Sequence, residues 1–384
     1  MISSIRLQNY RNHKDTEIEF GELTALVGPN SAGKSNVLEA IRCFTRLSEG
    51  KAFSDIFSGS QDPDVVVRHG ETSFALRLAG KKPVDWHINV KFVAGGYPDD
   101  EESKGHGPPP QLSGKWKWDA ESSDKLSFTG DIFSGYSSGE RLRRYLTRAT
   151  YLKAIAQNLS DPSIPQEVPP RLRENGNGLA SVISYLMTTE PARFNQLVLR
   201  LQEIVPEVEG LRIRPKVPKN NSGREEKKGR LDELLYDMKG GKGIPAHSVS
   251  EGTLVATGLL AALIGNEERE PHFLMIDDLE QGLHPKAQRE LIGVLRAIQK
   301  QQSPLQIVFT THSPYIVDEL APEETWLLNT DADGVAHARR LSEHPDAEKS
   351  LQVLTTGEFW SAEGEGWVVG DGASDETSAQ PSAE

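Results

Sequence analysis

The sequence predicts an α/β fold, namely a mixed β-sheet with flanking helices, an N-terminal antiparallel β region and an inserted helical lobe. Three observations lead to it. Short apolar or alternating runs such as "TEIEF", "LTALVG" and "TSFALRLAG" dominate the first ninety or so residues, which is typical of strands. One amphipathic helix, "GKSNVLEAIRCFTRL", interrupts them. Near the C-terminus, "HFLMI", "KAQRELIGVLRAIQK", "LQIVFTT" and "PYIVDEL" alternate as strand and helix.

Length and composition exclude several classes of protein. The chain has 384 residues, of which 36% are apolar, and this length allows about two or three domain-sized units. Its 43 Lys and Arg against 56 Asp and Glu give a net charge of -13, which argues against a uniformly basic nucleic-acid coat. Cys43 is the single cysteine, which fits a reducing compartment. Without a signal-peptide core or an apolar run long enough to span a bilayer, we expect a cytoplasmic protein with no membrane contact.

Composition shifts divide the chain into four segments. Residues 1–138 form the β-rich first part, in which residues 95–114 are rich in Gly, Pro and charge and predict an exposed loop. Residues 139–244 predict a mostly helical lobe and a basic loop, without the sustained heptads of a coiled-coil arm. Residues 245–340 carry the second α/β block. Residues 341–384 predict a partly disordered, acidic tail from Ser361 onward, in which Trp367, Val368 and Val369 are candidates for docking.

The strongest motif is a phosphate-binding loop. The stretch "LTALVGPNSAGKSNVLEAI" matches G-x-x-x-x-G-K-[ST], with a strand before it and a helix after it. A Gly-rich turn that fits by chance is the alternative, and the strand and helix argue against it. Backbone amides and the helix N-terminus would bind phosphates, Lys34 would reach the β- and γ-phosphates of ATP, and the Ser35 hydroxyl would ligate Mg²⁺. The predicted nucleotide-binding residues here are Gly28, Pro29, Asn30, Ser31, Ala32, Gly33, Lys34, Ser35 and Asn36.

A second strand ends in two acids, in "FLMIDDLEQGLHP". Asp277 ends the apolar run and is predicted to hold the water shell of Mg²⁺, and Asp278 stands where a catalytic base would orient the attacking water. A helix cap or a turn is the plain alternative for such a pair. Aspartate is one methylene shorter than the usual glutamate, and a displacement of about 1 Å can cost about a hundredfold in rate. We therefore expect slow hydrolysis.

Two further elements frame this strand. Ser250 and Gly252 open an apolar helix, "SEGTLVATGLLAAL"; Ser250 is a natural N-cap, and the sharper interpretation is that Ser250 and the Gly252 amide bind a γ-phosphate. His312 follows the strand "IVFTT", where a γ-phosphate sensor is expected, although a lone histidine at a strand end is usually a structural hydrogen bonder. The order of phosphate loop, S-x-G, apolar strand with two acids, and histidine is distinctive.

This order resembles the ATP-binding-cassette ATPases, in particular the RecF/OLD/SMC-like branch of AAA family ATPases that includes ATPase subunits of bacterial antiphage defence systems. "IRLQNYRNHKDTEIEF", "GPNSAGKSN", "SEGT", E-x-GLHP and "THSPYIVDEL" carry the resemblance, over residues 1–47 and 245–330. It implies a homodimer, or a higher even oligomer, with ATP between the phosphate loop of one copy and the Ser250 helix of the other. Residues 281–284 would cross the interface, and Arg11 and Asn12 would lie near the nucleotide. It also implies a Q-loop glutamine, for which several candidates remain.

Departures from the branch narrow the expected role. RecF-type members have Asp-Asp as here, whereas most relatives have Asp-Glu. Neither a long coiled coil nor the acidic constellation of a TOPRIM nuclease domain is evident, so the resemblance implies an ATP hydrolase that gates a separate effector protein in defence or DNA maintenance. The alternative is a RecF-like repair ATPase that contacts DNA directly through basic segments at residues 141–148 and 214–230, which otherwise are solvated faces. A membrane transporter's cassette subunit fits the motifs less well.

Overall fold

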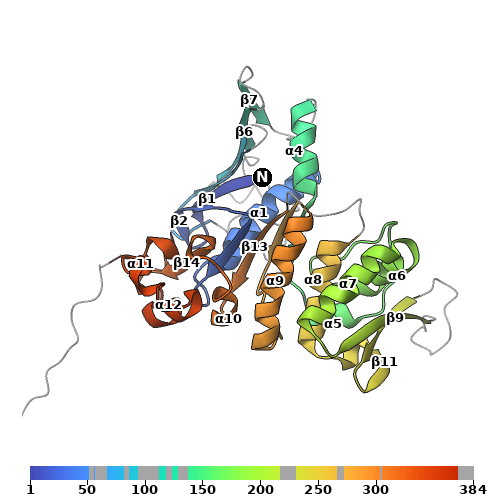
Figure 1. Ribbon diagram of the computed structural model, residues 1–384. Helices are drawn as coiled ribbons and strands as arrows, with labels where there is room; N and C mark the ends of the chain where they lie inside the picture. Colours follow the sequence, from blue (N-terminus) through green and yellow to red (C-terminus); the bar gives the residue numbers. More distant parts are fainter. Residues whose placement is uncertain are drawn as a thin grey trace, which may run out of the picture.

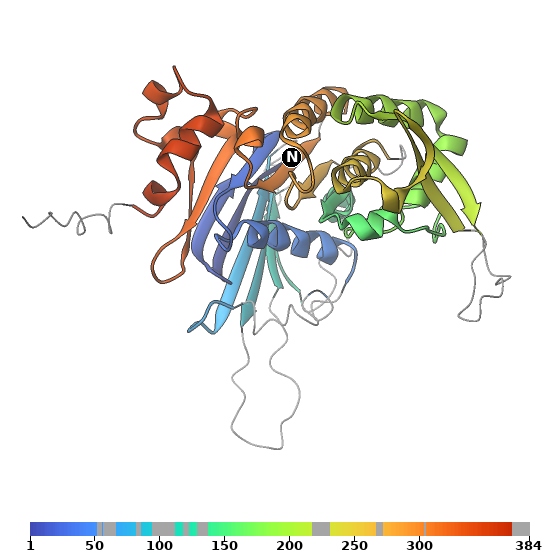
Figure 2. The same cartoon turned by 90° about the horizontal axis from the view of Figure 1, so that it is seen from below.

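The computed structural model describes residues 1–51, 56, 67–81, 86–93, 112–117, 123–128, 137–216, 231–265, 272–302 and 305–370. Of residues 92–93, 112–117, 123–128 and 137–141 only the backbone is described. Figure 1 and Figure 2 show a central sheet with a lobe of helices on one side and a group of short C-terminal helices on the other. In the described ranges no helix is both long and apolar enough to cross a membrane.

The central sheet has the strand order β15-β14-β3-β13-β12-β8. Five of these strands run parallel, and β15 is antiparallel at one edge. The strands are β3 (Leu23–Val27), β8 (Ala149–Leu152), β12 (Phe273–Ile276), β13 (Gln306–Thr311), β14 (Thr325–Thr330) and β15 (Ala336–Arg340). The expected mixed β-sheet is therefore confirmed.

Both faces of the central sheet are buried, as parallel sheets require. Alternate residues of β12 point to opposite faces: Leu274 and Ile276 belong to one core cluster, and Phe273 and Met275 to the other. The first cluster contains the long helices α6 (Leu179–Thr189), α7 (Pro191–Ile204), α8 (Glu251–Ile264) and α9 (Pro285–Gln301). The second contains α1 (Lys34–Ser48) and the N-terminal sheet.

That N-terminal sheet is antiparallel throughout, in the order β2-β1-β4-β5-β6-β7. Its strands are β1 (Ile2–Tyr10), β2 (His13–Glu19), β4 (Ser73–Gly80), β5 (Trp86–Val93), β6 (Leu112–Lys117) and β7 (Ser123–Phe128). β6 begins inside the predicted exposed loop of residues 95–114, so the last three residues of that prediction are strand. Residues 94–111 lie outside the described part of the chain.

The predicted helical lobe differs from the structure in two respects. After α4 (Ser137–Thr147), the four residues of β8 join the central sheet beside β12; so short a run carries no periodicity that separates strand from helix. Beyond α5 (Ala156–Ser160), α6 and α7 follows an antiparallel sheet of β9 (Val208–Lys216), β10 (Leu231–Met238) and β11 (Gly241–Pro245). A turn of 3₁₀ helix, η2 (Ala246–Ser248), then leads to α8.

The predicted basic segments are described only in part. Arg214 and Lys216 lie on β9, and both form ion pairs with Glu233. Residues 217–230 and the side chain of Arg141 lie outside the described residues.

The first part of the predicted C-terminal tail is folded. After α10 (Pro314–Val317) and η4 (Pro322–Glu324), the chain forms η5 (Leu341–Glu343), α11 (Ala347–Ser350), α12 (Thr356–Glu363) and η6 (Gly366–Val368). Phe359 and Val368 are buried in the core, and Trp367 packs against it. The expectation of disorder from Ser361 is therefore wrong as far as residue 370, because apolar side chains anchor this segment to its own head. Residues 371–384 lie outside the described part.

Candidate nucleotide-binding site

The loop between β3 and α1 has the backbone of a phosphate cradle. Gly28 and Gly33 have φ of 145° and 97°, a region that glycine tolerates best. A Cβ on Gly28 would lie 2.1 Å from the Leu328 carbonyl oxygen, so only glycine fits against β14. Helix α1 starts without a side-chain cap, which leaves its first turn, with the positive end of the helix dipole, suited to an anion.

Lys34 lies at the centre of this cradle. Its side chain is nearly buried, and its Nζ donates hydrogen bonds of 2.8 Å to the carbonyl oxygens of both Gly28 and Pro29. Burial lowers the pKa of Lys34 to about 8, and the carboxylates of Asp278, Glu280 and Asp277 oppose this shift. The ammonium is thus held inside the loop, among acceptors that a phosphate could replace.

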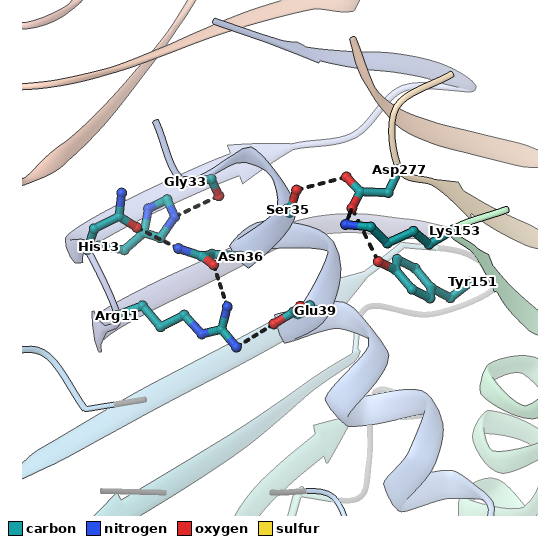
Figure 3. A network of polar contacts seen from close by, with 10 residues as sticks. Arg11, His13, Gly33, Ser35, Asn36, Glu39, Tyr151, Lys153 and Asp277 are labelled. Carbon is teal, nitrogen blue, oxygen red and sulfur yellow. Dashed lines mark hydrogen bonds and ion pairs between the residues drawn. The ribbon is translucent and has the colours of Figure 1, made fainter. Parts of the chain in front are cut away.

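Asp277 and Ser35 meet at the edge of the central sheet where the parallel strands β3 and β12 end (Figure 3). The Ser35 hydroxyl donates to Asp277 Oδ1 at 2.8 Å, and the Thr310 hydroxyl donates to the same oxygen at 2.8 Å. Burial by itself would raise the pKa of Asp277, but hydrogen bonds from Lys153, Thr310 and Ser35 hold it below its usual value. The site therefore offers a hydroxyl beside an ionised carboxylate. Such oxygen donors suit Mg²⁺, so the residues fit the expected metal.

Lys153 is a site residue that sequence reasoning missed. Its Nζ donates to Asp277 Oδ2 at 2.7 Å, and the Tyr151 hydroxyl lies 3.5 Å from the same oxygen. This contact follows from the pairing of β8 with β12, in which Leu152 lies opposite Ile276. The next residue on each strand then faces the same point. A glutamine was expected from the resemblance, but the side chains that bond to Asp277 in the described ranges include none.

Asp278 begins the turn after β12 with a left-handed backbone, φ 57°. Its amide donates to the Thr310 hydroxyl at 2.8 Å, so Thr310 on β13 orients both aspartates. His312 follows β13, and its amide donates to Glu280 Oε1 at 2.7 Å. The other oxygen of Glu280 is buried without a hydrogen bond. The acid pair and His312 therefore lie at the neighbouring carboxyl ends of two parallel strands, β12 and β13.

The start of α8 contacts the loop after the carboxylate strand. Ser250 is an N-cap whose Oγ accepts from the Thr253 amide at 3.3 Å. A Cβ on Gly252 would lie 2.3 Å from the Gly282 carbonyl oxygen, and Gln281 donates to Glu251 at 2.9 Å. The plain capping role of Ser250 is thus present, and its γ-phosphate role remains a proposal.

Two predicted residues of the N-terminal hairpin lie beside the phosphate loop. Asn12 Nδ2 donates to the Ser31 carbonyl at 3.1 Å, and its Oδ1 accepts from Asn36 at 2.8 Å. Arg11 donates to Asn36 at 2.6 Å and forms an ion pair with Glu39 on α1 (Figure 3). These contacts connect the N-terminal hairpin to the phosphate loop and to helix α1, which follows it.

His13 also belongs to this hairpin, and the sequence did not single it out. It is fully buried, with Nε2 3.1 Å from the Gly33 carbonyl oxygen and Nδ1 3.0 Å from the Thr16 hydroxyl. Burial lowers the pKa of His13 to about 4, so the ring is neutral near pH 7. The ring packs against Gly33 of the phosphate loop, and a Cβ on Gly33 would clash with it.

The fold and this arrangement define the head of a P-loop ATPase of the ABC and SMC type. Comparison with protein families agrees: the family model described as "AAA domain, putative AbiEii toxin, Type IV TA system" matches residues 23–318. The chain belongs to this family of ATPases, and the resemblance to the RecF/OLD/SMC-like branch is confirmed.

Curated relatives match over short stretches. A Rad50 ATPase named for DNA double-strand break repair, from Methanopyrus kandleri, is 57% identical over 42 residues, which is 11% of this chain and 5% of that protein. RecF of Exiguobacterium sp. is 54% identical over 41 residues, 10% of this chain and 11% of RecF. Septu protein PtuA of Bacillus thuringiensis is 33% identical over 86 residues, 22% of this chain and 20% of PtuA. The aligned stretches thus span a small part of these relatives.

Solved structures agree on the fold. An Smc head bound to the C-winged helix domain of ScpA superposes with a TM-score of 0.58 at 14% identity, covering 90% of this chain and 99% of that one. An Smc head with an extended coiled coil, bound to the C-terminal domain of ScpA derived from Pyrococcus furiosus, gives 0.53 at 14% identity, covering 92% and 99%. At this identity the likeness concerns the fold alone.

Proposed function

We propose that this protein binds ATP with Mg²⁺, hydrolyses it slowly and uses the cycle to switch between separate copies and a homodimer or higher even oligomer. The observation that carries the proposal is the convergence of Lys34, Ser35 and Asp277 from two distant parts of the chain. Lys34 would bind the β- and γ-phosphates, and Ser35 and Asp277 would hold the metal. When bound, Mg²⁺ would neutralise part of the negative charge of the phosphates.

The second copy would complete the site. Gly252 and Glu251 contact the loop around Gly282 rather than the phosphate loop of the same chain, so a γ-phosphate role of the Ser250 helix would be exerted in trans. Asp278 would orient the attacking water, and His312 would contact the γ-phosphate. Because Asp278 is short and sits in a turn with left-handed backbone, its reach is limited, and we expect slow turnover.

Replacing Asp278 with Asn tests the switch, since it removes the base and keeps the side-chain size. We expect turnover to fall and an ATP-bound dimer to accumulate, seen by light scattering on a sizing column. Adding ADP in place of ATP is the control, because a dimer held by the γ-phosphate requires ATP. Unchanged turnover in this variant would remove Asp278 from the mechanism.

The cellular role that we propose is gating of a separate effector in antiphage defence or DNA maintenance. The similarity to Septu protein PtuA over 86 residues supports it. Copurification of the chain with the products of neighbouring genes tests this role. We expect a complex whose composition or activity changes with ATP, and recovery of only the free ATPase contradicts the gating role while leaving the ATPase cycle intact.

The alternative role is a RecF-like ATPase that acts on DNA directly, favoured by the similarity to RecF. In the described part of the basic region, Arg214 and Lys216 share the single carboxylate of Glu233, which offsets one of their two positive charges and weakens a phosphate-binding stripe there. An ATP-stimulated affinity of the chain alone for DNA that falls steeply with salt would favour this alternative.

A further inference from the structure

The Asp277 carboxylate already forms an ion pair with the ammonium group of Lys153. Its Oδ1 accepts from Ser35 and Thr310, and its Oδ2 accepts from the Lys153 ammonium at 2.7 Å with Tyr151 at 3.5 Å. The carboxylate that the proposed function assigns to the metal shell is therefore saturated by donors of the protein itself. Water molecules around Mg²⁺ would have to donate to an oxygen that Lys153 now occupies.

The two partners of this ion pair differ in freedom. The Asp277 side chain is fully buried, whereas that of Lys153 is 56% exposed. The backbone of Lys153 is fixed, because its amide donates to the Glu174 carbonyl at 2.8 Å and the Glu174 side chain is held by Arg42. Only the lysine side chain can move, and it can move into solvent.

We propose that Lys153 stands in for Mg²⁺ at Asp277 while the site holds no metal, and that the metal ion displaces it. This rests on the proposed binding of ATP with Mg²⁺. A divalent ion and an ammonium compete for one carboxylate oxygen because both are attracted to it and repel each other. The lysine keeps the buried acid neutralised and reduces its repulsion of nucleotide phosphates when metal is absent. Lys153 is therefore a positioning residue that sets how strongly nucleotide binding depends on Mg²⁺.

The test measures the affinity of the full chain for a fluorescent ATP analogue, once with Mg²⁺ and once with EDTA. The quantity compared is the ratio of the two affinities. Replacing Lys153 with Ala removes the stand-in cation, which weakens metal-free binding, and removes the competitor, which strengthens binding with Mg²⁺. We expect the ratio to rise by up to about fivefold, as for loss of one partly exposed charge partner. A ratio that stays the same or falls overturns the proposal.

Three matched variants separate this effect from a change in structure. Lys153→Arg keeps the charge and should leave the ratio near that of the wild type. Lys153→Gln keeps much of the side-chain length without the charge and should raise the ratio as the alanine variant does. If the alanine variant unfolds at a lower temperature, the glutamine variant still tests the loss of charge. Lys239→Ala removes a charge from an exposed turn and should change nothing. If the wild type binds no nucleotide under either condition, the proposed function is wrong. If it binds nucleotide but the ratio of affinities is the same in the Lys153 variants, only this inference is wrong.

Discussion

Replacing Gly252 with Ala probes the contact between the start of α8 and the loop after the carboxylate strand. The added Cβ would lie 2.3 Å from the Gly282 carbonyl oxygen, 2.9 Å from its carbon and 3.2 Å from Leu283 Cα. All three atoms are backbone, so no side chain can rotate away. Because nonbonded carbon contacts are comfortable near about 3.5 Å, helix and loop must separate by about 1 Å.

The expected cost is about 1–3 kcal/mol of overpacking, reduced by up to about 1 kcal/mol of gained helix propensity. Since Asp278 opens the same loop, turnover should fall by as much as about a hundredfold. Gly293→Ala in α9 is the matched control, because a Cβ there meets nothing within 4 Å, and it should stabilise the protein slightly. Urea unfolding and steady-state ATP hydrolysis give the two readouts. Equal stability and turnover in both variants would refute the tight contact.

Three other changes have clear expected outcomes. Lys34→Ala removes the ammonium from the phosphate loop and should abolish binding of a fluorescent ATP analogue while the fold, checked by circular dichroism, persists. Thr310→Val takes a donor from Asp277 and leaves the Asp278 amide unpaired, so the unfolding free energy in urea should fall by about 1–3 kcal/mol and hydrolysis should slow. For His13, the pKa is about 4 in the folded chain against 6.5 ordinarily. The unfolded chain therefore takes up the proton first, and stability should fall by about 3 kcal/mol as pH drops from 6.5 to 4. His13→Gln should remove this slope in urea unfolding measured at pH 5 and pH 7.

The local parts of the site can be predicted from the sequence alone. The phosphate loop, the helix that it starts and the aspartate at the end of β12 follow from short-range patterns, because glycine placement, helix capping and strand alternation act over a few residues. Strand and helix periodicity also predicted the mixed sheet with flanking helices, and the order of motifs carries the resemblance to the ATPase branch.

Which distant side chains contact one another depends on the tertiary fold. Lys153 reaches Asp277 because β8 pairs with β12 across 124 residues of sequence, and His13 reaches Gly33 from another strand. Phe359 and Val368 fold against the head in a segment whose composition indicated disorder. Such contacts depend on which strand lies beside which and on burial against distant residues, and no local periodicity encodes either one.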